Sequence, residues 1–174
     1  MNMASATVLV ENKVFVEEKR KRDQLIQRGF GELTERKLVL DLFESLFLME
    51  KDKLEIQRLT GKDVDEKSLL KLGLKLDKQF YSKFLVFRDL RSKGFVVRTG
   101  LKFGFDFRVY PKGKKPGEEH TYWVIHVSTQ DEKVSFPEIS RMVRLAGNIH
   151  TIVLQAVVDS EDDINYYELR RITP

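Results

Sequence analysis

Apolar and polar residues alternate almost without a break along residues 102–110, KFGFDFRVY, which is the pattern of a half-buried β-strand. The face predicted to be buried carries Phe103, Phe105, Phe107 and Val109. The opposite face carries charged residues and ends in Tyr110. We therefore expect this tyrosine to be presented in charged surroundings at the end of the strand.

Apolar patterning predicts several further strands. Residues 152–158 are almost wholly apolar, as in a strand that is covered on both faces. An acidic turn at residues 160–163 separates this strand from a final one. Besides 102–110, the predicted strands span residues 8–10, 14–16, 54–59, 95–98, 120–127, 152–158 and 164–172.

Apolar residues at helical spacing predict three main helices. The first runs from an N-cap at Thr34 to about residue 51, and the second spans about 77–93 and ends before Gly94. The third opens with the capping-box pattern of residues 135–138 and leaves Arg141 and Arg144 off its apolar stripe. A shorter helical segment begins at about 63–66, and the charged residues 17–28 are assigned no element.

The order of these elements changes near residue 80 and predicts two domains. Residues 1–79 mix short strands and helices, whereas residues 80–174 open with the long helix and continue mainly as strands. The predicted fold class is α+β or mixed α/β. A small mixed N-terminal domain precedes a C-terminal domain in which helices flank a mixed sheet.

Composition narrows the class of protein. The chain has 174 residues, of which 41% are hydrophobic and 33% charged, as in globular proteins. No apolar run approaches the roughly 18 residues of a membrane-spanning helix, and the first residues lack the pattern of a secretory signal. We therefore expect a cytoplasmic protein. The absence of cysteine excludes disulfides, thiolate metal sites and a cysteine nucleophile.

Charge permits a polyanionic partner without demanding one. The 31 basic and 27 acidic residues give a net charge of +4, and the isoelectric point is near 9.2. Basic residues crowd into 13–28, 88–115 and 141–144. Such clusters suit a nucleic acid, although a solvated basic surface explains them equally well.

Tyr110 and His120 flank a basic loop and form the candidate site. The loop contains Lys112, Lys114 and Lys115. Together these groups suit phosphate chemistry, although a tyrosine at a strand end and a histidine in a loop are each ordinary alone. Arg141 and Arg144 are interpreted either as a solvated helix edge or as a clamp for phosphate or a base.

No metal or other cofactor is expected. The three histidines, His120, His126 and His150, show neither the spacing of metal ligands nor neighbouring carboxylate clusters. His126 lies on an apolar strand and is interpreted as structural. No glycine loop of the phosphate-binding type leads into a helix.

In combination, these segments resemble the archaeal tRNA-splicing endonucleases. In the C-terminal half, the resemblance rests on FLVFRDLRSKGFVVRTG, GLKFGFDFRVY, His120 ten residues later, MVRLAGNIH, LQAVVD and INYYEL. In the N-terminal half, it rests on a glycine bend followed by ELTERKLVLDLFESLFLMEKDKLEI. The resemblance covers essentially the whole chain.

The resemblance implies a small N-terminal domain, a restriction-endonuclease-like C-terminal domain and a metal-independent cleavage of precursor tRNA. Such enzymes cut at bulge–helix–bulge intron boundaries and leave 2′,3′-cyclic phosphate and 5′-hydroxyl ends. Tyr110 matches the family's general base, His120 its general acid, and Arg144 an arginine that helps to sandwich a bulge nucleotide. The second sandwiching arginine is not assigned, because Leu169 occupies its place beside Arg170 and Arg171.

One family residue is missing. Family members carry a lysine just before the apolar strand, where this chain has Thr151. Within the segment Asn148–Thr151, only His150 could carry a positive charge, and only in its protonated form. The favoured hypothesis is a structural subunit that works with a catalytic one. The expected assembly is a heterotetramer, and a homo-oligomer is the alternative. The alternatives are a self-sufficient endonuclease that uses Tyr110 and His120, with His150 or a neighbour's basic residue replacing the lysine, and a non-catalytic RNA-binding scaffold. Residues 130–133 match the family's acidic docking loop.

Overall fold

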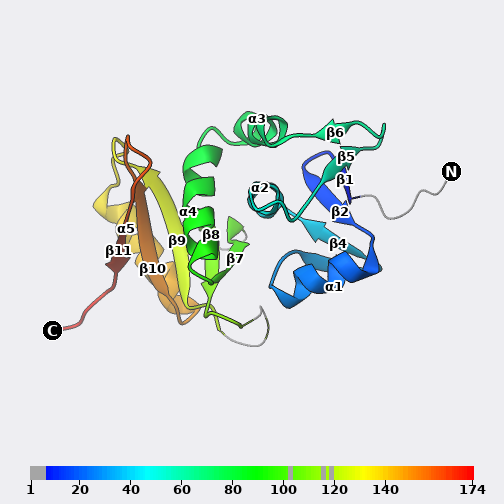
Figure 1. The fold of residues 1–174 in the computed structure, drawn as a ribbon. Helices are drawn as coiled ribbons and strands as arrows, with labels where there is room; N and C mark the ends of the chain where they lie inside the picture. The colour runs from blue at the N-terminus through cyan, green and yellow to red at the C-terminus, as the bar shows by residue number, and fades with distance from the viewer. Residues whose placement is uncertain (1–6, 102–103, 115–116, 118–119) are drawn as a thin grey trace. The chain divides into compact units, whose positions relative to one another are not determined.

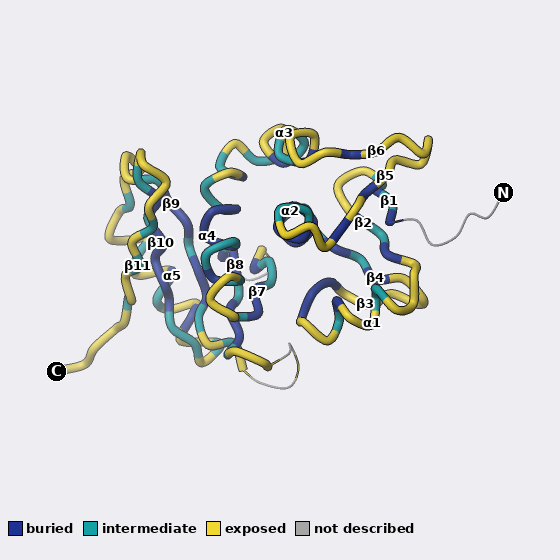
Figure 2. The backbone as a smooth tube through the Cα atoms, viewed as in Figure 1, coloured by how far each residue is buried: buried dark blue, intermediate teal, exposed yellow. Residues whose placement is uncertain are grey.

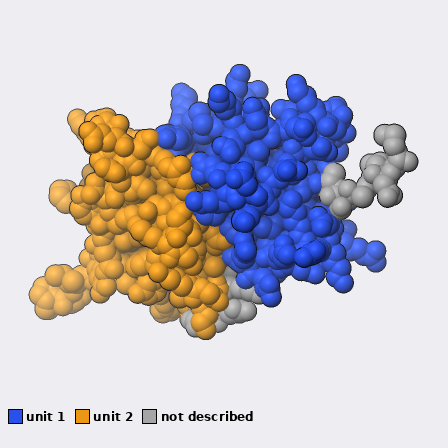
Figure 3. All heavy atoms as spheres, in the orientation of Figure 1, with its two compact units in different colours: residues 1–81 blue, residues 82–174 orange. Residues whose placement is uncertain are grey.

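A computed structural model describes residues 7–101, 104–114, 117 and 120–174. The chain divides into two compact units, Met1–Tyr81 and Ser82–Pro174, which Figure 3 distinguishes by colour. Each unit is built around a mixed β-sheet of its own. The predicted fold class of two mixed αβ parts is therefore confirmed.

The N-terminal unit contains a six-stranded sheet in the order β3-β4-β2-β1-β5-β6. Only the pairing of β1 with β5 is parallel, and the other pairings are antiparallel. The strands are β1 (Thr7–Val10), β2 (Lys13–Val16), β3 (Glu32–Thr34), β4 (Lys37–Leu40), β5 (Ile56–Arg58) and β6 (Asp63–Val64). The helices are α1 (Lys19–Gln27), α2 (Leu42–Glu50) and α3 (Glu66–Leu76).

The helix predicted from Thr34 is wrong over its first third, because residues 37–40 form β4 and pair with β2. The helix begins only after Asp41, whose carboxylate accepts the Glu44 N–H at 2.8 Å. The Glu44 carboxylate in turn accepts the N–H groups of Asp41 at 3.1 Å and Gly31 at 2.8 Å. This reciprocal capping sets the start of α2 seven residues after the predicted cap.

The sequence also gave no indication of α1. Its only buried residue is Leu25, and the residue that precedes it, Glu18, makes no side-chain capping bond. A helix with such a narrow buried face leaves little apolar periodicity in a charged segment. Tertiary packing of Leu25, rather than a local signal, stabilises the helix in this part of the chain.

The C-terminal unit contains a five-stranded sheet in the order β11-β10-β9-β8-β7 (Figure 1). The central strands β9 and β10 are parallel, and all other neighbours are antiparallel. The strands are β7 (Val96–Thr99), β8 (Phe107–Tyr110), β9 (Trp123–Thr129), β10 (Ile152–Val158) and β11 (Ile164–Leu169). The helices are α4 (Phe80–Ser92) and α5 (Phe136–Asn148).

The alternating segment at 102–110 forms a shorter strand than predicted. Residues 102 and 103 lie outside the described residues, and Gly104 has a φ of +75°, so regular pairing starts only at Phe107. The preceding turn is tight at Gly100, whose N–H donates to the Asp106 carbonyl at 2.8 Å. A Cβ at Gly100 would lie 2.9 Å from the Phe105 carbonyl oxygen, so the turn requires glycine.

Helices cover both faces of this sheet. On one face, Phe87 of α4 packs against Phe107 of β8 with ring centroids 5.9 Å apart. On the other face, Met142 and Ala146 of α5 pack with Phe105, Val124 and Val153. Figure 2 shows the resulting buried segments of β9, β10 and α4 in dark blue.

Within the described residues, no helix combines the length and the apolar character that crossing a membrane requires.

Asp106 joins three parts of the C-terminal unit. Its carboxylate accepts the Val127 N–H at 2.8 Å and forms an ion pair with Lys83 of α4 at 2.8 Å. Its own N–H donates to the Ile125 carbonyl at 2.9 Å. The side chains of Lys83 and Asp106 are 15% and 12% exposed, so solvent screens their attraction only weakly. The carboxylate thereby holds the entry of β8 against both β9 and α4.

We expect Asp106→Asn to lower the free energy of unfolding by about 2–4 kcal/mol, because the variant removes the negative charge that faces the mostly buried Lys83. Urea denaturation followed by circular dichroism measures the change. The double variant Asp106→Asn with Lys83→Met should regain part of the loss, since it removes the buried cation as well. As a matched control, Asp131→Asn removes an exposed acid and should change stability by less than about 0.5 kcal/mol. Equal effects of the two asparagine variants would contradict the role assigned to Asp106.

Candidate functional site

Three strand termini meet at one end of the C-terminal sheet. Val109 of β8 lies opposite Trp123 of β9, and Trp123 lies beside Ile152 of β10. The end of β8 therefore adjoins the starts of β9 and β10. This end of the sheet therefore brings together two residues that are far apart in sequence. They are Tyr110, the last residue of β8, and Thr151, which precedes β10.

Tyr110 is buried rather than exposed, so the predicted presentation of this side chain is wrong. Only 4% of the residue is exposed, and it pairs with Val96 of β7. β8 lies between β7 and β9, and its register with β9 ends one residue earlier, at Val109 opposite Trp123. The Arg108 guanidinium lies 6.0 Å from the Tyr110 ring centroid, so a positive charge faces the aromatic ring.

His120 lies in the connection between β8 and β9 and is exposed. It precedes Tyr122 by two residues, and the Tyr122 N–H donates to the Val109 carbonyl at 2.7 Å. His120 therefore belongs to the segment that leads into the same end of the sheet as Tyr110. Of the three lysines in the basic loop, Lys112 and Lys114 are exposed, and Lys115 lies outside the described residues.

Thr151 is held by the end of α5. Its N–H donates to the Ala146 carbonyl at 3.0 Å, while the His150 N–H donates to the Gly147 carbonyl at 3.1 Å. This pair of bonds is the Schellman pattern that closes many helices. The Thr151 hydroxyl donates to the Tyr122 carbonyl at 3.0 Å. The side chain thus ties the start of β10 to the segment that carries His120.

His150 occupies the left-handed position of this helix end. Its φ is +53°, a conformation that glycine adopts most easily and that strains other residues. Its side chain is exposed directly beside Thr151. An exposed histidine in a strained position is a candidate functional group, because such strain tends to persist at functional sites.

Arg144 and Arg141 are both exposed on α5, off the face that packs on the sheet. The first turn of this helix carries the predicted capping box between Ser135 and Glu138. The Ser135 hydroxyl and N–H lower the pKa of Glu138, and the positive charge of Arg141 lowers it further. Glu138 is therefore negatively charged at neutral pH, and Arg144 lies nearer the Thr151 end of the helix than this carboxylate does.

Leu169, the last residue of β11, occupies the position of the expected second clamp. Leu169 packs against the apolar cluster beneath α5 and is partly buried. The Arg170 guanidinium forms an ion pair with Glu168. Residues 130–133 form a turn after β9, and both Asp131 and Glu132 are exposed there.

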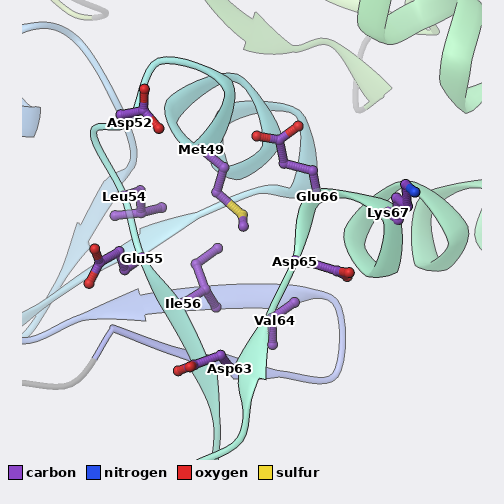
Figure 4. A pocket seen from close by; sticks show the side chains of 10 residues that line it. All are labelled: Met49, Asp52, Leu54, Glu55, Ile56, Asp63, Val64, Asp65, Glu66 and Lys67. Atoms are coloured by element: carbon purple, nitrogen blue, oxygen red, sulfur yellow. The ribbon is translucent and has the colours of Figure 1, made fainter.

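A concave region of about 680 Å³ lies in the N-terminal unit, away from these residues in sequence (Figure 4). Its apolar part is formed by Met49, Leu54, Ile56 and Val64, and its acidic residues are Asp52, Glu55, Asp63, Asp65 and Glu66. So many carboxylates would repel a phosphate. Within the described part of the chain, no three His, Asp or Glu side chains are grouped so that they could hold a metal ion.

Sequence reasoning overlooked Tyr122. The residue is 52% exposed. Its N–H donates to the Val109 carbonyl of β8, and its carbonyl accepts the hydroxyl of Thr151, which precedes β10. Its aromatic side chain just before an apolar strand was the available signal. In that segment, the sequence pattern predicts a functional role only for His120.

Comparison with protein families matches both parts of the chain. Residues 80–166 match the family model of the tRNA intron endonuclease catalytic C-terminal domain. Residues 5–70 match the model of the tRNA intron endonuclease N-terminal domain. The two matches follow one another in the order of the two compact units.

Individual proteins from archaea are similar over most of their length. A tRNA-splicing endonuclease from Thermococcus onnurineus is 38% identical over 159 residues, which cover 91% of each chain. One from Pyrococcus furiosus is 36% identical over 160 residues, again 91% of each chain. One from Methanothermobacter thermautotrophicus is 35% identical over 145 residues, 83% of this chain and 84% of the relative. The chain therefore belongs to the tRNA intron endonuclease family.

Proposed function

We propose that this chain is a subunit of a tRNA-splicing endonuclease, in which it is the structural partner of a catalytic subunit. Family membership over both halves of the chain supports a role on precursor tRNA. The complex would cut at bulge–helix–bulge intron boundaries in the cytoplasm, without a metal or other cofactor. Its domains would be an N-terminal domain of residues 1–79 and a catalytic-like domain of residues 80–174.

The cleavage chemistry defines what an active site needs. A base removes the proton of the ribose 2′-hydroxyl, and the 2′-oxygen attacks the adjacent phosphorus. As the bond from phosphorus to the 5′-oxygen breaks, an acid protonates that oxygen, which leaves a 2′,3′-cyclic phosphate and a 5′-hydroxyl. The phosphorane formed on the way carries extra negative charge, so a nearby cation lowers its energy. In an active chain, Tyr110 would be the base and His120 the acid.

The observation that carries the proposal is the side chain at position 151. A lysine would supply the cation, but Thr151 is neutral and its hydroxyl donates to the Tyr122 carbonyl. Loss of one such transition-state contact costs roughly 2.7–4 kcal/mol, or about 10²–10³ in rate. A lone chain with Thr151 would therefore cleave slowly even with Tyr110 and His120 in place.

The burial of Tyr110 favours the same conclusion. A general base must come within hydrogen-bond distance of the ribose hydroxyl, yet Tyr110 is only 4% exposed. His120 is exposed and would reach an RNA more easily. A buried base and a missing cation both support the interpretation that the two residues are vestigial.

RNA binding does not depend on these groups. Arg144 is exposed on α5, and a guanidinium can stack on a bulge base while it attracts the adjacent phosphates. We propose that Arg144 contributes one side of a base sandwich. The ion pair of Arg170 with Glu168 gives no support for a second sandwiching arginine in this chain.

A partner chain would complete the enzyme. β11 has a neighbour on one side only, so its free edge could pair with the corresponding strand of another subunit. The exposed acids Asp131 and Glu132 would dock into a basic cleft of a further subunit. We propose a heterotetramer with two chains of each kind; a homo-oligomer is the alternative assembly.

The alternative function is a self-sufficient endonuclease. The specific observation in its favour is the exposed, left-handed His150 beside Thr151, since a protonated imidazole could replace the missing cation. A non-catalytic RNA-binding scaffold outside splicing is the third hypothesis. It would bind RNA without regard to the bulges.

We expect the purified chain to leave a bulge–helix–bulge RNA intact under conditions in which addition of a lysine-bearing homologue restores cutting.

In the lone chain, Thr151→Lys should raise the cleavage rate by up to about 10²–10³, because it restores a cation near the phosphorane. Gel analysis of end-labelled RNA measures the rate and identifies the cyclic phosphate.

Two further variants test the origin of that gain. Thr151→Gln has a similar polar character without a charge and should give no increase. Tyr110→Phe in the Thr151→Lys background should abolish the increase if Tyr110 is the base. Rapid cleavage by the unmodified chain would refute the structural-subunit proposal and leave the self-sufficient enzyme.

We expect His150→Gly to raise the free energy of unfolding by roughly 0.5–1 kcal/mol, because glycine relieves the left-handed strain but gains more entropy when unfolded. Urea denaturation measures the change. Asn148→Gly, at the last helical position, is the control and should instead lower stability slightly.

The same His150→Gly variant also separates the two catalytic hypotheses. In a structural subunit, it should leave the cleavage rate of the reconstituted complex unchanged. A large loss of cleavage with intact folding would assign His150 a catalytic role.

A further inference from the structure

A row of aromatic side chains ends at the candidate site. The Tyr122 and Trp123 ring centroids are 4.3 Å apart, and Trp123 meets Phe95 edge-on at 5.5 Å. The Lys112 ammonium lies 5.2 Å from the Phe95 ring centroid. The row therefore runs from the basic loop after β8 to the residue just before β9, all within the C-terminal unit.

Tyr122 is fixed at the exposed end of this row. Its N–H donates to the Val109 carbonyl at 2.7 Å, and its carbonyl accepts the Thr151 hydroxyl at 3.0 Å. Its ring contacts Trp123 on one side. With both backbone groups bonded and the ring supported, Tyr122 has little freedom left to lose when a ligand binds.

The exposure of Tyr122 is high for a side chain with so many restraints. It is 52% exposed, whereas Trp123 and Phe95 behind it are partly buried. A supported aromatic ring that remains half exposed offers a flat apolar surface to a planar ligand. Nucleobases are such ligands, and every base can stack on an aromatic ring whatever its hydrogen-bonding groups.

We propose that Tyr122 is a stacking platform for a nucleobase adjacent to the scissile phosphate, and that Lys112 binds a phosphate flanking that base. The proposal rests on the proposed function, because it takes RNA as the ligand of this sheet end. It adds a base-binding position that is separate from Arg144, which lies on α5. Tyr122 adjoins Tyr110 through the Val109 carbonyl and Thr151 through its own carbonyl. A base stacked there would therefore lie next to the residues that would act on the phosphate.

Thr151 would then have a second role. Its hydroxyl bond fixes the backbone of Tyr122, so the residue that replaces the lysine also positions the platform. This positioning role differs from catalysis, because Thr151 acts through Tyr122 rather than on the phosphate. It predicts that Thr151→Val weakens RNA binding, whereas Thr151→Ser retains it.

The affinity of the full-length chain for RNA tests the platform. The ligand is a bulge–helix–bulge RNA with 2′-deoxyribose at both cleavage positions, which binds but cannot be cut. Fluorescence anisotropy of the labelled RNA measures Kd, and the fluorescence of Trp123, the single tryptophan of the chain, reports locally on Tyr122. RNA should quench this fluorescence.

Tyr122→Ala should raise Kd by about 5- to 150-fold, the range expected for loss of one stacked base. Tyr122→Phe should keep Kd within about threefold, because stacking requires the ring and not the hydroxyl. Phe136→Ala is the matched control, since Phe136 is 87% exposed at the opposite end of α5 from Thr151. It should leave Kd unchanged. Lys112→Gln should reduce the slope of log K against log salt by roughly 0.7–0.9, as expected for one lost phosphate contact.

The outcomes separate the platform from the proposed function. If Tyr122→Ala binds the RNA as tightly as the unmodified chain and RNA leaves Trp123 fluorescence unchanged, the platform is refuted while the RNA-binding role stands. If the unmodified chain fails to bind this RNA both alone and together with a catalytic subunit, the proposed function and the platform are both refuted. A thermal melt of each variant verifies folding, so that a loss of affinity in Tyr122→Ala with an unchanged melting temperature supports the platform.

Discussion

The partly buried ion pair between Asp106 and Lys83 is the constraint on which the C-terminal unit depends. The Asp106 carboxylate also accepts the Val127 N–H of β9. One acidic group just before β8 therefore contacts both α4 and β9. A carboxylate that loses most of its hydration must regain these contacts inside the protein, which leaves few alternative arrangements. The register of β8 against β9 follows from this anchor and determines which residues reach the far end of the sheet.

That far end shows how a site is assembled from separate segments. The antiparallel pairing of β8 with β9 places Val109, the residue before Tyr110, opposite Trp123, the residue after Tyr122. The parallel pairing of β9 with β10 brings in Thr151, which precedes β10. The closing turn of α5 then fixes Thr151 through the Ala146 carbonyl. Backbone hydrogen bonds, together with the bond from the Thr151 hydroxyl to the Tyr122 carbonyl, hold the arrangement.

Much of the fold was accessible from local patterns. The β10 strand, the capped helix α5 and the end of α4 before Gly94 have strong local signals, because apolar periodicity, a capping box and a left-handed glycine each act within a few residues. The errors occurred where distant contacts decide. β4 is a strand because β2 lies beside it, and α1 is a helix although only Leu25 of its residues is buried. Neither partner is visible in the local sequence.

The sequence by itself determined the two-part αβ architecture and the family, and it shows a threonine at position 151. These features depend on the order and identity of residues, which a single chain displays directly. Only the tertiary structure decided that Tyr110 is buried, that Thr151 bonds to the Tyr122 carbonyl and that Tyr122 stands half exposed against Trp123. Exposure depends on which distant segments pack around a residue. The cited pairings join residues 14–29 positions apart in sequence, and alternation within one strand carries no information about them.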